Sequence, residues 1–267
     1  MRDAWRLCVG TFTALPTRPP SRVGARTWGG AMLFAPVTVL PAAAGWVGLA
    51  LLTTHALMPY AVAAVLALVV TALLTRALHL DGLADFADGL TSGHDHERSL
   101  EVMRRGNTGP AGAAALVLVL GLDAACLAAL LTDSRGAVLA VTALVASRLA
   151  PAICARHGIP AARPAGLGHG VAGTVTRRAL VGVVFGVSVG AATVAATVAE
   201  ATGDELSWWS MPLGAAVVAV AGAGGAVATR RHAVRRLGGV TGDVIGAAME
   251  VGLAAALVIA SVAHTAM

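Results

Sequence analysis

The chain has 267 residues, of which 57% are hydrophobic and 12% charged, and its formal net charge is +5. A soluble domain carries about 25% charged residues, so this chain has too few charges to cover a water-exposed surface. The composition also excludes a disordered chain, and the three cysteines, without C-x-x-C spacing, exclude a disulfide scaffold. We therefore expect an all-α, polytopic integral membrane protein.

Seven stretches are long and apolar enough to cross the hydrocarbon, which takes about 20 helical residues. They are residues 29–52, 56–75, 110–131, 136–155, 179–199, 212–229 and 244–263. In residues 1–28, by contrast, arginines are interspersed with apolar residues, and prolines follow from Pro16 on. We expect 1–28 to form an amphipathic helix in the headgroup layer and 29–267 to form one transmembrane domain.

The arginines indicate how the chain sits in the membrane. Eighteen of the 19 basic residues, all of them arginine, lie before the first stretch or near the connections that follow the second, fourth and sixth. Only Arg135 falls in a connection of the opposite set. Because cytoplasmic connections are enriched in basic residues, we expect a cytoplasmic N-terminus. The net positive charge is then explained by the orientation of the chain in the membrane. We therefore expect no nucleic acid as a partner.

Residues 79–89 follow the second apolar stretch and read His-Leu-Asp-Gly-Leu-Ala-Asp-Phe-Ala-Asp-Gly. If the preceding helix continues, Asp81, Asp85 and Asp88 share one stripe near its C-terminal end. Anions are disfavoured there and repel each other, so Asn at any one position should leave stability unchanged or slightly higher. Oxygen ligands of this kind suit Mg²⁺ that bridges to a diphosphate. We favour a metal site over a solvated acidic helix end.

Two loops on the same predicted side hold further candidates. Arg104 and Asn107 precede Pro110 at the start of the third stretch, where a helix N-terminus and arginines suit a phosphate, although a basic flank explains the same residues. Near the last stretch, Thr241 can cap the helix and Asp243 lies in its first turn. Capping does not explain Glu250, because an ionisable group inside a span is usually functional.

Three residues at other places have competing interpretations. His79 precedes the acidic stripe and could bond to a substrate or a carboxylate. Arg148 lies near the inner headgroup level and could simply extend into it. Asp123 lies inside the third stretch, where an ionisable side chain has either a structural or a functional role.

Together these segments resemble the cobalamin-5′-phosphate synthase family. Four segments match family motifs in order, and the first and last are the most specific: 79–89, 100–109, 147–148 with 166–168, and 238–250. The start at 12–16 is similar to the family's F-x-T-R-x-P. The chain departs from the family pattern at Ala14, Arg105, Gly106 and Leu253, so we assign no carboxylate role to positions 105 and 253.

The resemblance implies an enzyme of the bacterial cytoplasmic membrane whose active site faces the cytosol. It would be a Mg²⁺-dependent transferase that joins adenosylcobinamide-GDP to α-ribazole, or to α-ribazole 5′-phosphate, and releases GMP. The catalytic residues would be Asp81, Asp85, Asp88 and Asp243, and the first three would also hold the metal. Substrate contacts would come from His79, Arg104, Asn107, Arg148, Thr241 and Glu250.

Among the arginines, we expect Arg104 and Arg148 to contact the donor diphosphate, and Arg135 and Arg163 not to contact it.

Two other functions stay open at this point. They are a CDP-alcohol-type lipid head-group phosphotransferase and an ion-coupled membrane transporter. Besides its substrates and membrane lipid, the partners could include a second copy of the chain or other corrinoid-pathway enzymes.

The arginine distribution predicts that the N-terminus and residues 76–109, 156–178 and 230–243 lie in the cytosol. A cysteine placed at Ser92 should therefore resist a membrane-impermeant thiol reagent in intact cells and react after permeabilisation. A cysteine at Thr132, in an outer connection, should react in intact cells and serves as the control. Labelling of Ser92→Cys in intact cells contradicts this topology.

Overall fold

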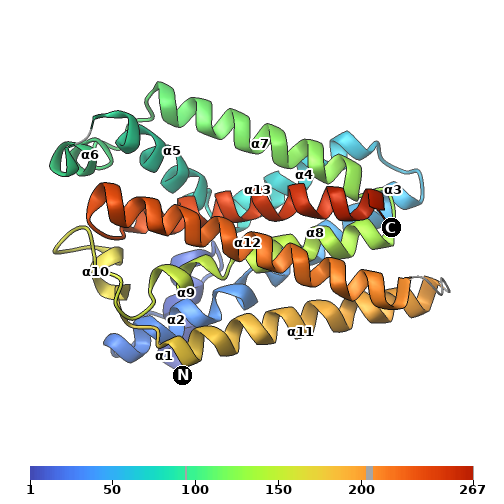
Figure 1. The fold of residues 1–267 in the computed structure, drawn as a ribbon, viewed down its shortest axis with the longest axis horizontal. Helices are drawn as coiled ribbons and strands as arrows, with labels where there is room; N and C mark the ends of the chain where they lie inside the picture. The colour runs from blue at the N-terminus through green and yellow to red at the C-terminus, as the bar shows by residue number, and fades with distance from the viewer. Residues whose placement is uncertain (94, 203–206, 267) are drawn as a thin grey trace.

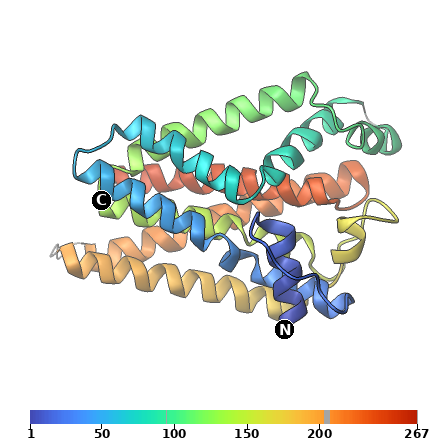
Figure 2. The same cartoon turned by 180° about the vertical axis from the view of Figure 1, so that it is seen from behind.

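The computed structural model describes residues 1–93, 95–202 and 207–266, and these residues form an all-α bundle without a β-strand (Figures 1 and 2). This confirms the predicted fold class. The helices, in chain order, are α1 Arg2–Phe12, α2 Ala25–Thr38, α3 Leu40–Thr54, α4 Tyr60–Leu74, α5 Leu78–Thr91, α6 His96–Val102, α7 Pro110–Leu130, α8 Ser134–Ser147, α9 Ala150–Cys154, α10 Leu167–Val171, α11 Arg177–Thr202, α12 Ser207–Leu237 and α13 Gly242–Ala266.

Each of the seven predicted stretches coincides with helix. Within the described residues, six helical segments are long and apolar enough to cross a membrane: Ala25–Thr54, Pro110–Leu130, Ser134–Cys154, Arg177–Ala201, Trp209–Leu237 and Gly242–Ala266. The second predicted stretch, 56–75, is not among these six. It corresponds to Tyr60–Leu74, which is one arm of a bent helix pair with Leu78–Thr91. Part of the predicted connection between the fifth and sixth stretches, residues 203–206, lies outside the described residues.

The expectation that the second stretch continues as one helix into the acidic segment is wrong. α4 ends at Leu74, and α5 sets off at 93° to it, so the two form a V in Figure 2. The break is at Arg76 and Ala77, which both have left-handed backbones, with φ of 56° and 52°. At about 1.5 Å per residue, the 15 residues of α4 span about 22 Å, less than the hydrocarbon thickness.

The N-terminal segment holds this break in place. The N–H of Ala14 donates to the Leu74 carbonyl at 2.7 Å, and the Arg76 guanidinium donates to the Gly10 carbonyl at 2.8 Å. Carbonyls at a helix end within a membrane need such partners, because lipid offers none. α1 ends at Phe12, before the prolines, and its buried residues pack against α2. It is therefore bound to the bundle through its apolar face.

The break directs α5 across the first half of α13, and two glycines allow the backbones to meet. A Cβ on Gly82 would lie 2.8 Å from the Asp243 carbonyl oxygen, and a Cβ on Gly246 would lie 3.1 Å from the His79 backbone. A side chain larger than hydrogen at either position would push the helices apart. At its other end α5 is fixed by Arg236 of α12, which donates to the carbonyls of Leu90 and Gly93.

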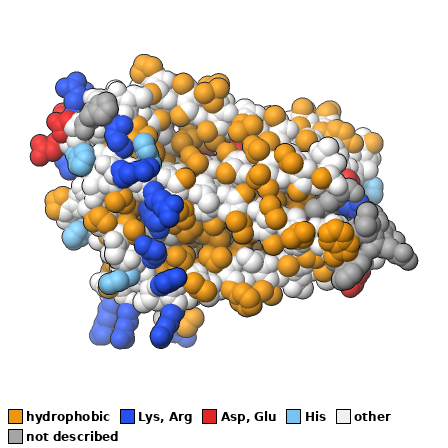
Figure 3. Space-filling view, in the orientation of Figure 1, with side chains coloured by type: hydrophobic (Ala, Val, Ile, Leu, Met, Phe, Trp, Pro, Cys, Tyr) orange, Lys and Arg blue, Asp and Glu red, His pale blue; other side chains and the backbone are white. Residues whose placement is uncertain are grey.

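Charged side chains concentrate at one end of the bundle. The face in Figure 3 shows arginines around α6, α10 and the beginning of α11, while apolar side chains cover the middle. In the apolar 18-residue part of α11 only 6% is buried within the protein, whereas in the corresponding part of α13 72% is buried. α13 is therefore a central helix, and α11 presents most of its apolar surface outward.

Candidate active site

The acidic group lies where α5 crosses the N-terminal turns of α13, at the arginine-rich end. Asp81 is exposed and Asp85 is half-buried, both on α5, and Asp243 is half-buried at the start of α13. Asp85 is within electrostatic reach of the other two. Because α5 is a separate helix, Asp81 lies in its first turn, where a carboxylate is favoured, and not at the end of a spanning helix. This corrects the predicted placement of the stripe.

Asp88 has a different environment from Asp81 and Asp85. Its carboxylate is buried and accepts hydrogen bonds from the N–H groups of Gly109, at 2.6 Å, and Gly112, at 2.9 Å. It thereby caps the N-terminus of α7 from a neighbouring helix, as an anion at a helix N-terminus does. The expectation that Asn at this position preserves stability needs correction, because both carboxylate oxygens of Asp88 accept from backbone donors.

Arg163 supplies the positive charge closest to the acidic group. Its Nη1 lies 3.7 Å from Oδ2 of Asp243, and its Nη2 donates to the Leu100 carbonyl of α6 at 2.8 Å. Burial lowers the pKa of the Arg163 guanidinium, and the Asp243 carboxylate opposes this shift. Arg104 is exposed and is a second cation in reach of Arg163. The prediction that Arg163 does not contact the donor diphosphate stays a prediction, but its guanidinium lies beside the acidic group.

A cavity of about 170 Å³ opens beside Asp243. Its lining comes from two segments far apart in sequence: Arg163 and Ala165 to Gly168, and Val240 to Asp243. Backbone hydrogen bonds join these segments, because the Val240 N–H donates to Pro160 and the Ala162 N–H donates to Val240, both at 3.0 Å. Thr241 is buried and caps α13 by accepting from the Val244 N–H at 3.2 Å, as its sequence position predicts.

Three predicted substrate-binding residues form a buried ionic cluster behind the acidic group. Nδ1 of His79 lies 3.8 Å from Oε1 of Glu250, and Nη1 of Arg148 lies 4.0 Å from the same oxygen. Arg148 also donates to the Ser147 hydroxyl at 2.8 Å and is only 1% exposed. Arg148 therefore does not extend into the headgroup layer, because its guanidinium faces carboxylates of the core.

Asp123 of α7 completes this cluster. It is fully buried and is an electrostatic neighbour of Glu250 and Arg148. Removing either Arg148 or Glu250 would leave the other as an uncompensated buried charge, which costs about 3–5 kcal/mol. The cluster thus ties α5, α7, α8 and α13 together beneath the acidic group.

Two questions remain: where Asn107 lies, and whether the carboxylates could hold a metal. Asn107 is exposed in the segment between α6 and α7, two residues before Gly109, whose N–H binds Asp88. Within the part of the chain that the structure describes, no three histidine, cysteine or carboxylate side chains are arranged as a ready-made metal cage. Asp81, Asp85 and Asp243 do converge from two helices.

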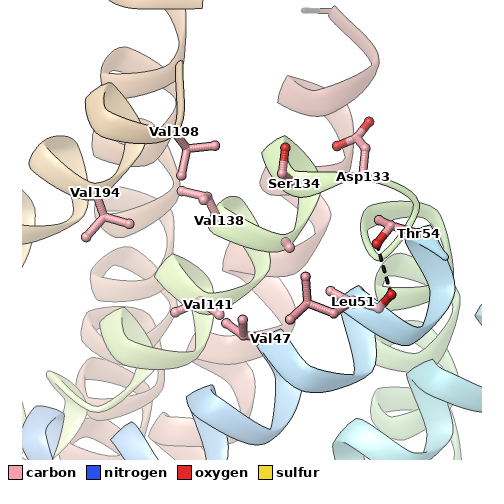
Figure 4. A pocket seen from close by; sticks show the side chains of 11 residues that line it. Val47, Leu51, Thr54, Asp133, Ser134, Val138, Val141, Val194 and Val198 are labelled. Carbon is pink, nitrogen blue, oxygen red and sulfur yellow. Dashed lines mark hydrogen bonds between the residues drawn. The ribbon is translucent and has the colours of Figure 1, made fainter. Parts of the chain in front are cut away.

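A second cavity is unrelated to this chemistry. It measures about 310 Å³ and lies between α3, α8 and α11, where Val47, Val138 and Val194 are among the apolar side chains that line it (Figure 4). Its lining includes Asp133 and Ser134 at the start of α8. This end of α8 lies away from α5 and α6 (Figure 1). Its walls offer few polar groups, so it does not suit phosphate chemistry.

The fold and the site define a class: a polytopic helical membrane enzyme whose carboxylates and arginines converge at one end of the bundle, as phosphate-ester chemistry requires. The family model for cobalamin-5-phosphate synthase matches residues 4–261. The chain belongs to this family.

Curated relatives agree over nearly full length. The chain is 41% identical to the adenosylcobinamide-GDP ribazoletransferase of Nocardioides sp. strain JS614, over 96% of this chain and 97% of the relative. It is 33% identical to the protein of that name from Frankia casuarinae, over 95% and 92% of the two chains, and 35% identical to that of Pseudomonas putida F1, over 90% of each. No solved structure matches the chain.

Sequence reasoning missed two arginines that shape the site. Arg163 was predicted not to contact the donor diphosphate, and Arg236 was counted only as a topological charge. The signal available for Arg163 was its distance of three residues from Gly166-Leu167-Gly168, a segment that was recognised. That it meets Asp243 depends on how two loops pair, and the sequence pattern does not contain this information.

The two environments within α5 predict opposite effects on stability. Asp88→Asn should lower the free energy of unfolding by about 0.5–2 kcal/mol, as loss of a helix cap does, because an amide presents only one acceptor oxygen to two N–H donors. Asp85→Asn should leave stability unchanged or raise it slightly, because it removes repulsion from Asp81 and Asp243. Thermal unfolding in detergent without Mg²⁺ measures both, and equal melting temperatures for the two variants contradict the capping role.

Proposed function

We propose that the chain transfers α-ribazole, or its 5′-phosphate, onto adenosylcobinamide-GDP with release of GMP, as a late step of coenzyme B12 synthesis. One observation carries the proposal. The chain belongs to the cobalamin-5-phosphate synthase family, and the family motifs at 79–89 and 238–250 lie together in space where α5 crosses α13. Relatives that cover nearly the whole chain carry the corresponding name.

The residues around the cavity have complementary tasks in this reaction. Arg163 and Arg104 offer guanidinium groups to the donor diphosphate, which bears the charge that builds up as GMP departs. A ribose hydroxyl of the acceptor attacks the phosphorus attached to cobinamide, and the bond from that phosphorus to GMP breaks. The proton of the hydroxyl passes to a carboxylate of the acidic group, for which Asp85 and Asp243 are the half-buried candidates.

The acidic group also suits Mg²⁺. Asp81, Asp85 and Asp243 are hard oxygen donors that repel each other, and Arg163 is the cation seen to pair with this group among the described residues. Mg²⁺ commonly takes one or two protein carboxylates and completes its shell with water and substrate phosphates, so a closed protein cage is not needed. When bound, it would neutralise charge on the diphosphate. Because Asp88 caps α7, we propose that it supports the position of α5 and is not itself a metal ligand.

Both rival functions fit the site less well. A CDP-alcohol phosphotransferase would be expected to carry D-G-x-x-A-R after its first aspartate, whereas Ala84-Asp85 follows here. A transporter would hold its polar residues at mid-membrane on a path between the two sides. In this chain Asp81, Asp85 and Asp243 lie together at the arginine-rich end, and we propose that this end faces the cytosol.

Turnover should depend on Asp85. Asp85→Asn keeps the size of the side chain but removes an anion, so GMP release from adenosylcobinamide-GDP and α-ribazole in the presence of Mg²⁺ should fall by at least about 100-fold. Glu101→Gln is the matched control, because Glu101 is an exposed carboxylate whose partner is the exposed Arg105, four residues later.

The assay separates the candidate functions. Release of CMP from a CDP-alcohol, with no GMP released from the corrinoid donor, would favour the lipid enzyme. Full activity of Asp85→Asn with unchanged Mg²⁺ dependence would remove the acidic group from the mechanism.

Arg163 and Arg104 should both matter for donor binding. Replacing either by Gln should raise the KM for the donor, or lower kcat/KM, by about 10- to 100-fold, because a charge-assisted contact contributes about 1.5–3 kcal/mol. Arg105→Gln, which changes an exposed arginine paired with Glu101, should leave the kinetics unchanged. Steady-state GMP release over a range of donor concentrations tests this, and wild-type kinetics in both Arg163→Gln and Arg104→Gln refute it.

A further inference from the structure

A third cavity lies at the arginine-rich end, between the loop after α9 and the first turn of α11. It measures about 360 Å³ and is lined by Arg156, His157, Thr176 and Arg177, with walls made mainly of apolar atoms. None of these four residues belongs to the acidic group, the Arg163 cavity or the buried ionic cluster. The reaction proposed above therefore leaves this cavity without a role.

The cavity is built on two paired loops. The His157 N–H donates to the Val175 carbonyl at 2.7 Å, and the Val175 N–H donates to the Ala155 carbonyl at 2.9 Å. Ala155 and Val175 are buried, at 0% and 1% exposure. This pairing fixes the chain at Arg156 relative to the start of α11, so Arg156 and Arg177 are held on two sides of one space.

The charge around the cavity is positive and uncompensated. Arg230 of α12 is 7% exposed, and Arg156 and Arg231 are its electrostatic neighbours. The Nε atoms of Arg156 and Arg230 are buried without a hydrogen-bond partner among the described residues. Within the same part of the chain, no carboxylate lies within ion-pair distance of the five arginines that gather here: Arg156, Arg177, Arg178, Arg230 and Arg231.

The N-terminus of α11 adds to the attraction for an anion. Thr176 precedes the helix, and its hydroxyl accepts from the Ala179 N–H at 3.2 Å. The N–H groups of Arg177 and Arg178 come before the first helical hydrogen bond, which Leu180 donates to Thr176, and so have no partner in the helix. A phosphate at this point would meet both free N–H groups and guanidinium groups.

An apolar strip continues from the cavity along α11. Arg177, Val181 and Phe185 follow each other at four-residue spacing, so they share one face of the helix. Val181 is 60% exposed and Phe185 is 68% exposed. A ligand with a phosphate at Arg177 and long hydrocarbon chains would place those chains against this strip. Free phosphate would leave the strip unused.

We propose that this cavity binds the headgroup phosphate of an anionic phospholipid, whose acyl chains lie along Val181 and Phe185. The general excess of arginine at this end does not explain the site. Arg18 and Arg22, for example, are exposed in the N-terminal segment and line none of the cavities described above. Basic pockets between helices at the headgroup level are known to select anionic lipids. The lipid would hold the loop after α9 and the start of α11 against the membrane surface.

Native mass spectrometry of the full chain in detergent, with phosphatidylglycerol or phosphatidylcholine added, tests this site. The wild-type chain should retain phosphatidylglycerol in preference to phosphatidylcholine. The double change Arg156→Gln/Arg177→Gln should weaken that retention about 30-fold, and Arg177→Gln alone, at an exposed position, about 5-fold. Arg18→Gln/Arg22→Gln removes the same charge elsewhere at this end and should retain the lipid like wild type.

Three outcomes overturn the proposal. Equal retention of the two lipids by the wild-type chain shows that the cavity does not select an anion. Equal loss in the cavity and control double variants shows a general basic surface only. Displacement of phosphatidylglycerol by millimolar inorganic phosphate or glycerol 1-phosphate shows a free-phosphate site that does not use the apolar strip. If the cavity double variant fails to fold, as judged by thermal unfolding, Arg177→Gln alone decides the outcome.

Discussion

The break between α4 and α5 is the feature on which the site depends. A straight continuation would carry the aspartates along the axis of a spanning helix, away from α13. The 93° turn instead lays α5 across α13, and the Gly82 and Gly246 positions let the backbones meet. Breaking a helix inside a membrane exposes carbonyls, and the Ala14 N–H satisfies that of Leu74, while Arg76 at the break donates to the Gly10 carbonyl of α1. The short helix α1 is thus part of the site's support.

Charged groups are organised in two layers because their surroundings differ. The outer layer is the acidic group with Arg163 and Arg104, where partial exposure lowers the cost of charge and leaves room for a ligand. The inner layer is the cluster around Glu250, where burial makes an unpaired charge costly and Arg148 lies at ion-pair distance from Glu250. The inner layer joins four helices, so it positions the outer layer that would do the chemistry.

The arginines at one end of the bundle make several specific contacts. In the sequence they are visible only as an uneven distribution of positive charge. Arg236 holds the carbonyl end of α5, Arg163 faces Asp243 and Leu100, and Arg148 is buried against Glu250. Arg156 and Arg177 line the cavity at the start of α11. A basic residue near a membrane surface is favourable in general, and here the structure uses many of these residues for specific contacts as well.

The sequence by itself determined the all-α membrane class, the seven helical stretches, the family and the residue types of the site. These follow from hydrophobic length, local capping chemistry and motifs, all of which are encoded in short windows. Only the tertiary structure decided that α5 is a separate helix, that Asp88 caps α7, that Arg148 is buried and that Arg163 meets Asp243. Each of these depends on contacts between segments 20 to more than 100 residues apart, and no local pattern records which partner a polar side chain finds once the helices have packed.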